Sequence, residues 1–291
     1  MRAVSLHRDV IVVTSQLLQA HCTIIRGPAE GSGGKGASSA QAALPGDKEG
    51  AGEGRRGGTG ETFLVDSPIL PEELGLLGAL LEQAEFASPS GLLATHADWD
   101  HLLARIAFPD AALGCAESTA ARLHAEPGAA QRELRRFDEE LYIERHPPLS
   151  LGSIQALAVP GRCGIGEVEL ELLPADGHTG DGMAVWIPWA RVLVAGDYLS
   201  AVEIPTLQQE GDLDAYLTTL ERLRPLLAHA EHVVPGHGPV LDGARALVVL
   251  EEDTDYLKGL RERGAEAELP SGRRAGTQRG LHAENLARLT A

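Results

Sequence analysis

The chain has 291 residues, of which 43% are hydrophobic, and a formal net charge of −17 at pH 7. It is long enough to bury a full hydrophobic core, in one large domain or two small ones. The negative charge argues against nucleic acid as a partner, because no basic surface is available to hold phosphates. Cysteine occurs only three times, at Cys22, Cys115 and Cys163, an odd number without close spacing, which argues against a disulfide framework or a cysteine zinc site.

No targeting or membrane-spanning segment is recognisable in the sequence. Charged residues such as Arg2, Arg8 and Asp9 interrupt what would have to be an apolar run near the beginning, and no stretch approaches the length of a membrane span. We therefore expect a cytoplasmic protein with a small-molecule substrate and no membrane partner. The sequence leaves the oligomeric state open.

Residues 9–14 and 22–26 are rich in β-branched side chains and are predicted as opening strands. The tract between them and the next strand, residues 27–60, is dominated by glycine, with Leu44 as its one large apolar residue. Such a tract cannot bury enough surface to order itself, so we expect a flexible insertion. A mobile lid over a functional site is the alternative.

A third strand is predicted over residues 62–65, directly before Asp66, and a helix over 71–84 with Pro71 in its first turn. The apolar residues 91–95 predict a buried strand. Directly after it, His96, Asp98, Asp100 and His101 fall within six positions. This density of carboxylates and imidazoles at a strand end favours a bound cation, since the groups would otherwise repel or go unsatisfied.

Further along, two helices are predicted within residues 117–142, interrupted at Pro127 and Gly128, which either wall a pocket or simply pack on the body. Residues 153–173 alternate in a way that predicts two strands around a turn at 161–164. Amphipathic spacing predicts helices over 212–224 and 244–261, and a short last helix over 282–289.

Three more loops repeat the design of the cluster at 96–101. His178, Asp197 and His237 each follow a predicted strand closely and each has a glycine beside it, which allows a tight turn and a close backbone approach. One such loop would be weak evidence for a metal site. Four loops in succession, each presenting a metal-capable side chain, point to a metal centre built at one edge of a sheet.

The order His-x-x-x-Asp-His, Gly-His, Gly-Asp, Gly-His resembles the pattern of the metallo-β-lactamase-fold superfamily over residues 8–240. The resemblance implies a single domain with a four-layer αββα sandwich fold, extended by C-terminal helices at about 242–291. It also implies two metal ions. His96 and His178 then correspond to ligands of the first ion, Asp100, His101 and His237 to ligands of the second, and Asp197 to the bridging carboxylate. Asp66 corresponds to a residue that orients a ligand.

One position departs from the family pattern, because Asp98 stands where the family has its second histidine. Either Asp98 is itself a ligand, through oxygen, or the first site is weakened and one metal suffices. A ligating Asp98 would make a two-metal site with one hydroxide formally neutral. It would also shift metal preference from zinc, the first choice, toward manganese or iron.

For function, the resemblance implies a metal-dependent hydrolase in which a metal-bound hydroxide cleaves an ester, lactone or thioester bond, with Asp100 and Asp197 as catalytic residues. Phosphodiesterase or β-lactamase activity on the same site is an alternative. A second class is redox chemistry, as in the flavodiiron and sulfur dioxygenase branches of the superfamily. A third is a non-catalytic metal-binding protein.

Overall fold

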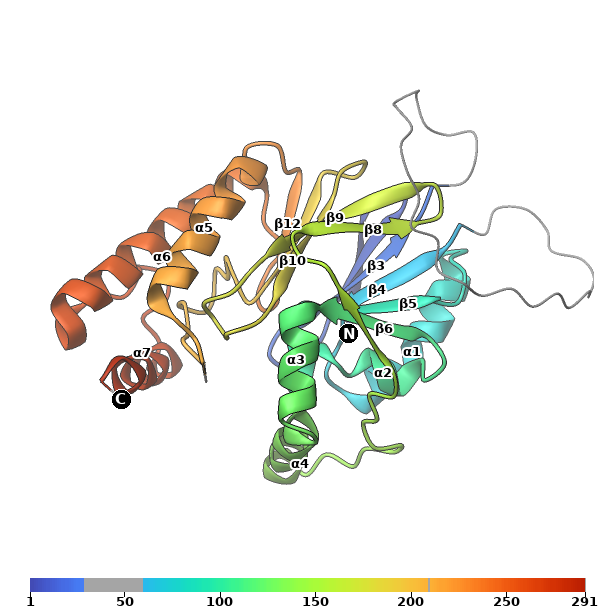
Figure 1. Ribbon diagram of the computed structural model, residues 1–291, viewed down its shortest axis with the longest axis horizontal. Helices are drawn as coiled ribbons and strands as arrows, with labels where there is room; N and C mark the ends of the chain where they lie inside the picture. The colour runs from blue at the N-terminus through green and yellow to red at the C-terminus, as the bar shows by residue number, and fades with distance from the viewer. Residues whose placement is uncertain (29–59, 209, 291) are drawn as a thin grey trace, which may run out of the picture.

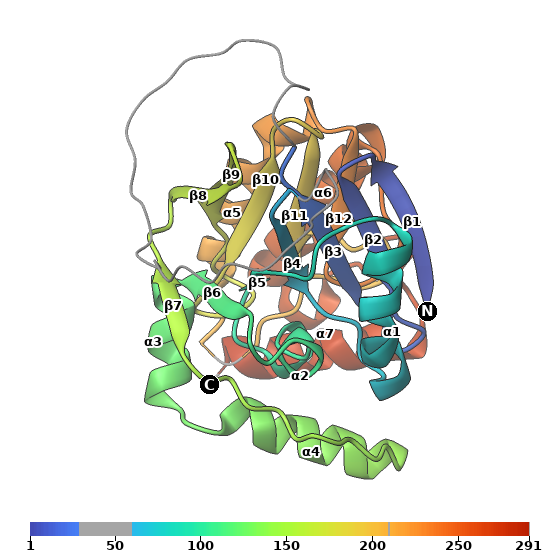
Figure 2. The same ribbon diagram turned by 90° about the vertical axis from the view of Figure 1, so that its right-hand side faces the viewer.

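The computed structural model describes residues 1–28, 60–208 and 210–290, arranged as two β-sheets packed face to face between two layers of helices (Figures 1 and 2). The predicted glycine-rich insertion falls almost wholly outside these described residues. The chain is thus mixed α/β with the expected αββα order of layers.

The first sheet has seven strands in sequence order, β1 to β7. Its first four strands pair antiparallel and its last four pair parallel. The strands are β1 (Arg2–His7), β2 (Val10–Thr14), β3 (His21–Arg26), β4 (Thr62–Asp66), β5 (Gly91–Ala94), β6 (Ala112–Ala116) and β7 (Ile154–Leu157).

The second sheet has five strands in the order β12-β11-β10-β9-β8, with only β11 and β12 parallel. The strands are β8 (Gly161–Ile165), β9 (Val168–Pro174), β10 (Met183–Ile187), β11 (Val192–Gly196) and β12 (His232–Pro235). All residues of β10 and β11 are buried, because one face packs on the first sheet and the other on helices.

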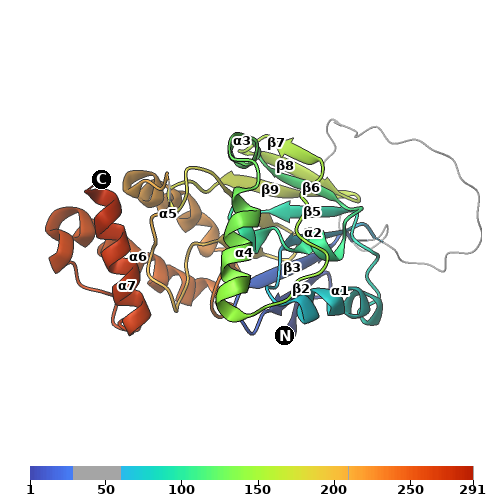
Figure 3. The same cartoon turned by 90° about the horizontal axis from the view of Figure 1, so that it is seen from below.

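Helices from the two halves of the chain cover opposite outer faces of the sandwich (Figure 3). The first sheet carries α1 (Pro71–Gln83), α2 (Ala104–Ala107), α3 (Glu117–Ala125) and α4 (Ala129–Leu141). The second sheet carries α5 (Leu213–Leu227), α6 (Gly243–Arg263) and α7 (Gly276–Leu289). Asp212 and Asp242 cap α5 and α6 by accepting a backbone N–H three residues on.

Three separate apolar clusters hold the layers together. The central one lies between the sheets and joins residues such as Val65 and Leu93 to Val185 and Val234. The outer two lie between each sheet and its helices. Within the described ranges, no helix is long and apolar enough to cross a membrane.

The strands that precede the candidate ligands all end at the same edge of the sandwich. In the first sheet β4 and β5 are parallel, so Asp66 and the segment after Ala94 emerge together. In the second sheet β9 and β11 both run antiparallel to β10, and β12 runs parallel to β11. The fold therefore brings loops from both sheets to one place.

The prediction for residues 153–173 was wrong in two respects. The segment forms three strands, and residues 161–164 belong to β8, with the reversal at Gly166 (φ 62°). The first of the three, β7, pairs with β6 in the other sheet. Alternating polarity reports which side chains are buried, but it carries no information about which sheet a strand joins. The structure also adds β1, β6 and β10, which were not predicted, and begins the last helix earlier, at Gly276.

Candidate metal centre

Seven candidate ligands converge from four loops at this edge of the sandwich. The loop after β5 supplies four of them, two within a short 3-10 turn (Trp99–His101), while β9, β11 and β12 each lead to one. Two groups of side chains result. The first group is His96, His178 and Asp197, and the second is Asp100, His101 and His237.

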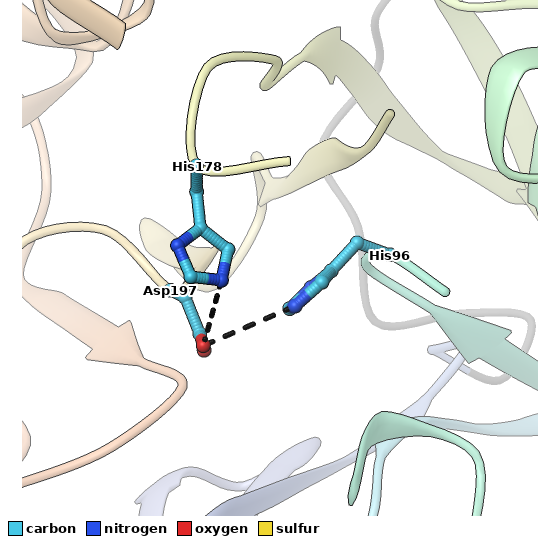
Figure 4. A group of neighbouring side chains, drawn as sticks. All are labelled: His96, His178 and Asp197. Carbon is cyan, nitrogen blue, oxygen red and sulfur yellow. Dashed lines mark ion pairs between the residues drawn. The ribbon is translucent and has the colours of Figure 1, made fainter. Parts of the chain in front are cut away.

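In the first group, two imidazoles face one carboxylate oxygen (Figure 4). Asp197 Oδ2 lies 3.4 Å from His178 Nε2 and 3.9 Å from His96 Nε2. Asp98 adjoins this group, since its Oδ2 lies 3.5 Å from His96 Nε2 and 3.8 Å from His178 Nε2. Asp98 therefore presents an oxygen where the family pattern has a histidine nitrogen.

Asp197 joins the two groups. Its other oxygen, Oδ1, lies 3.3 Å from His101 Nε2 and 3.5 Å from His237 Nε2. Asp100 Oδ2 completes the second group at 3.2 Å from His237 Nε2 and 3.7 Å from His101 Nε2. One carboxylate thus directs one oxygen into each group, which is the arrangement of a bridging ligand.

These separations match the spacing of ligand atoms around a metal ion. Metal–nitrogen and metal–oxygen bonds of about 2.0–2.2 Å in a tetrahedral site place the ligand atoms roughly 3.3–3.6 Å apart. Ordinary hydrogen bonds between the same atoms would mostly be shorter, at about 2.7–3.2 Å. The side chains are therefore spaced to surround ions more closely than to bond to one another.

Buried atoms without partners give a second test of this fit. Among the described residues, His96 Nε2, His101 Nε2, His178 Nε2 and Asp197 Oδ1 are buried without any hydrogen-bond partner. Leaving a buried polar atom unpaired costs about 1–3 kcal/mol. Four such atoms aimed at two common centres fit a pair of divalent cations.

The opposite nitrogen of each imidazole is held by the protein. The Nδ1 atoms of His178 and His237 donate to the carbonyls of Thr206 (2.9 Å) and Leu18 (3.1 Å). His101 Nδ1 lies 3.1 Å from Asp66 Oδ2, and His96 Nδ1 lies 3.2 Å from the Thr95 hydroxyl. These contacts fix the ring orientations and leave each Nε2 free to bind a metal.

Asp66 occupies a central place in this support. Besides facing His101, it accepts hydrogen bonds from the backbone N–H of Thr95 (2.8 Å) and from the Thr95 hydroxyl (3.0 Å). It therefore anchors the start of the ligand loop as well as one ligand.

The charges of the site favour ionised carboxylates. Burial opposes ionisation, but the facing imidazoles outweigh it, and the pKa of Asp197 lies well below its ordinary value. The pKa of Asp98 is also lowered, because His96, His178 and Arg122 outweigh burial. Burial lowers the pKa of His178. The facing carboxylates outweigh burial at His101 and His237 and raise the pKa of each well above its ordinary value. Carboxylate oxygens and the neutral His178 imidazole are thus available as ligands at neutral pH.

At this edge, other atoms approach the backbone so closely at two positions that only glycine fits there. A Cβ at Gly236 would lie 1.9 Å from Asp197 Oδ1, and one at Gly177 would lie 2.1 Å from the Tyr216 nitrogen, at a φ of +121°. Neither space can be made without moving the ligand loops. The glycines noted in the sequence next to His178 and His237 therefore permit the packing that assembles the site.

Several contacts at the site were not anticipated from sequence. Arg122 on α3 donates to Asp98 Oδ1 (2.9 Å) and to Asp181 Oδ1 (2.8 Å). The Tyr198 hydroxyl accepts a hydrogen bond from the His178 backbone N–H (3.0 Å). Asp181 is close in sequence to His178, and Tyr198 follows Asp197, so their positions could have suggested a place near the site. Nothing in the sequence around Arg122 indicated that it would reach Asp98.

Three further histidines lie outside both groups. His282 bonds to the Tyr256 hydroxyl (3.0 Å), and neither it nor His229 or His232 belongs to a metal-capable group within the part of the chain that the structure describes. On the helices predicted either to wall a pocket or to pack on the body, Phe137 packs on Trp99 with ring centroids 4.5 Å apart. Tyr142 is 93% exposed and lines a groove of about 560 Å³ along α4 that contains none of the candidate ligands.

Comparison with known proteins places this geometry in a family. Residues 56–237, more than half of the chain, match the sequence profile of the metallo-beta-lactamase superfamily. The chain belongs to this superfamily. The matched region begins ahead of β4 and ends at His237, so it includes every candidate ligand.

Individual members of the superfamily match shorter segments. The chain is 32% identical over 89 residues to the Beta-lactamase-like protein 2 homolog of Caenorhabditis elegans, covering 31% of this chain and 27% of that protein. It is 31% identical over 80 residues to the Metallo-beta-lactamase type 2 of Bacillus sp. (strain 170), covering 27% of this chain and 31% of that one. The chain thus spans about a third or less of these relatives.

Solved structures share the fold across most of the chain. A metallo-beta-lactamase family protein from Thermus thermophilus superposes with a TM-score of 0.58 at 20% sequence identity, covering 88% of this chain and 82% of that one. At this identity the likeness establishes the fold alone.

Proposed function

We propose that this superfamily member is a metal-dependent hydrolase that cleaves an ester, lactone or thioester bond in a small molecule. Membership of the superfamily and the two metal-capable groups support a metal-dependent hydrolase in general. The observation that carries the proposal is the geometry of Asp197, which directs one oxygen to each group.

The candidate residues would have separate roles in metal binding and catalysis. His96, Asp98 and His178 would hold one divalent ion, and Asp100, His101 and His237 would hold the other, with zinc as the first choice and manganese or iron as alternatives. Bound ions supply polarisation of the substrate oxygen and acidify water. Asp197 would keep the two ions at a fixed separation. Asp100 would orient the attacking water and take part in proton transfer to the leaving group.

Charge around the site supports a neutral carbonyl substrate over a phosphodiester. The Glu203 side chain lies in a small cavity together with Asp197 and His237. Burial and the carboxylates of Asp197 and Asp100 raise the pKa of Glu203, although His237 opposes this effect. The raised pKa favours an uncharged Glu203. Two divalent ions and one hydroxide, balanced by Asp98, Asp100 and Asp197, would make a formally neutral centre, which holds an anionic substrate less firmly than a positive one.

The test combines metal analysis with a panel of substrates. Protein purified without added metal is expected to contain two equivalents of a divalent metal. It should hydrolyse a carboxylic ester, lactone or thioester faster than a phosphodiester or a chromogenic β-lactam. Asp197→Asn should lose both metals and lower kcat/KM at least about 100-fold, whereas His229→Ala, at an exposed histidine, should change neither.

Two results would contradict the proposal. One is a protein that holds no metal at saturating zinc or manganese. The other is a fully loaded protein whose rate on every ester, lactone and thioester is unaffected by Asp197→Asn.

Asp98 favours one second candidate, a redox enzyme using iron. A carboxylate oxygen beside the first group is a harder donor than the histidine it replaces, and iron accepts such donors readily. An absorption spectrum separates the two proposals, because a colourless protein that is active with zinc or manganese excludes the iron enzyme.

A further inference from the structure

Arg122 makes a two-sided ion pair beside the first group. Its Nη2 donates to Asp98 Oδ1 (2.9 Å) and its Nη1 to Asp181 Oδ1 (2.8 Å). The Arg122 and Asp98 side chains are 20% and 18% exposed, and Asp181 is 2% exposed. A planar guanidinium bonded to two carboxylates has little freedom to turn, so it fixes the position of both.

Asp181 is itself anchored next to Asp98. Its second oxygen, Oδ2, accepts the backbone N–H of Ala97 at 3.0 Å. The contacts therefore form a closed ring that runs from the Asp98 side chain through Arg122 and Asp181 back to the chain directly before Asp98. The carboxylate of Asp98 is held relative to its own backbone by residues from α3 and from the His178 loop.

This ring decides which oxygen of Asp98 faces the metal centre. Because Oδ1 is bonded to Arg122, only Oδ2 faces the nitrogens of His96 and His178. We infer that Arg122 is a positioning residue that makes Asp98 a one-oxygen ligand of the first metal ion and offsets its charge. The inference rests on the metal site of the proposed function.

The charge of Arg122 explains how the site accepts an aspartate. A histidine ligand would be neutral, whereas the Asp98 carboxylate adds one negative charge beside the first ion. The guanidinium returns a positive charge within hydrogen-bond distance of that carboxylate, shared with Asp181. Asp98 and Arg122 are thus expected to act as a coupled pair.

Zinc affinity measures the positioning role directly. Competition with a chromophoric chelator gives the two zinc affinities, and His178→Ala and His237→Ala assign them to the first and second groups. Arg122→Ala should weaken zinc binding at the first group by about 10–100-fold, the usual cost of losing a residue that orients a ligand. Arg122→Lys should fall between, because an ammonium cannot bridge both carboxylates as a fork.

Two comparisons separate positioning from a general effect. Arg132→Ala removes an exposed arginine of α4 whose side chain, among the described residues, bonds only the Pro127 carbonyl, and it should leave both affinities unchanged. In an Asp98→His background, Arg122→Ala should change the first affinity by less than about threefold, because the carboxylate that Arg122 holds is gone.

Folding of each variant is checked by urea unfolding of the metal-free protein. If Arg122→Ala does not fold, because the buried Asp181 carboxylate loses its cationic partner, Arg122→Lys in the two backgrounds decides the question. Equal zinc affinity with and without Arg122, or the same loss in both backgrounds, overturns the inference while the proposed function stands. A chain that binds neither zinc nor manganese overturns both.

Discussion

At the scale of single residues, each histidine ligand is held by a contact to its Nδ1 atom, on the side of the ring away from the metal position. The two backbone carbonyls of Thr206 and Leu18 accept from His178 and His237, and Asp66 faces His101. Each contact engages Nδ1 and turns Nε2 toward the metal position. The ligands are therefore oriented before any ion binds, which lowers the entropic cost of binding one.

Replacing Asp66 with asparagine tests this orientation. The amide would keep the shape of the side chain but remove the negative charge facing His101 Nδ1. We expect zinc affinity at the second group to fall by about 10–100-fold and affinity at the first group to fall less. Isothermal or competition titration with zinc gives both values. Equal losses at the two groups would show that Asp66 acts on the loop as a whole and not through His101.

A second residue, His21, should make the free energy of unfolding depend on pH. It is 3% exposed, its Nδ1 donates to the Pro235 carbonyl (2.7 Å), and burial lowers its pKa to about 4. The unfolded chain has the ordinary value of 6.5, so between these two values only the unfolded state takes up the proton. The contribution of His21 to stability is complete above pH 6.5 and is lost as the pH falls toward 4, by up to roughly 3 kcal/mol.

Urea unfolding of wild type and His21→Gln between pH 7.5 and 4.5 checks this expectation. The free energy of unfolding of the wild type should fall more steeply with acid than that of the variant, since the other titrating groups are shared by both. Parallel pH profiles would mean that His21 titrates alike in the folded and unfolded states.

At the scale of elements, the C-terminal helices support a loop that lines the site. Asn285 on α7 accepts the N–H of Leu207 and donates to the Pro205 carbonyl, both at 2.8 Å. Gln278 accepts the N–H of Ile204 (2.8 Å), and the buried Arg273 donates to the carbonyls of Ser200 and Glu203. The same loop carries the Thr206 carbonyl that holds His178, so helices outside the superfamily match still act on the metal centre.

Asn285→Ala should expose this dependence. It leaves the buried N–H of Leu207 and carbonyl of Pro205 without their partner, at a cost of about 1–3 kcal/mol in stability. Through Thr206 it should also weaken zinc at the first group, by up to about tenfold. Glu284→Ala, at an exposed neighbour on the same helix, is the matched control. A loss of stability with unchanged zinc affinity would confine the role of α7 to folding.

At the scale of the whole molecule, the metal centre joins the two halves of the sandwich. Loops of the first sheet supply His96, Asp98, Asp100 and His101, and loops of the second supply His178, Asp197 and His237. Bound ions would therefore add links between sheets that already meet through side-chain packing and through the hydrogen bonds of His21 on β3 to Pro235 and Gly236. Binding to the folded state alone stabilises it by mass action.

Removing metal should lower the melting temperature accordingly. At a free metal concentration 100 times Kd, one site contributes about 2.7 kcal/mol, and a shift of about 2–4 °C per kcal/mol is usual for a chain somewhat smaller than this one. Dialysis against a chelator should therefore lower Tm by roughly 5–10 °C, and zinc should restore it. Calorimetry with metal analysis of each sample checks this. An unchanged Tm after complete removal of metal would show that the ions do not hold the sheets together.

The sequence by itself determined the kind of fold and the set of candidate ligands. Metal-capable side chains such as His96, His178 and His237 each follow a strand closely. This pattern involves residues that are neighbours in the sequence, so it can be recognised without the structure. Many of the strands and helices around them were predictable for the same reason. A strand or helix with one buried face has apolar residues at regular intervals, and these intervals can be read from the sequence. The sheet to which β7 belongs was not, because pairing depends on a partner elsewhere in the chain.

Only the tertiary structure decided what surrounds the ligands. Leu18 acts through its backbone carbonyl, which every residue possesses, so no side-chain pattern in the sequence indicates it. Thr206 contacts His178 Nδ1 through its carbonyl (2.9 Å) and its hydroxyl (3.0 Å), and only the fold brings the two residues together. Arg122 reaches Asp98 from a helix 24 residues away, and Asn285 acts on His178 through a loop 78 residues before it. Such contacts are chosen by packing in three dimensions. The departure at Asp98 was visible in the sequence, but the arginine that accompanies it came into view only when the chain was folded.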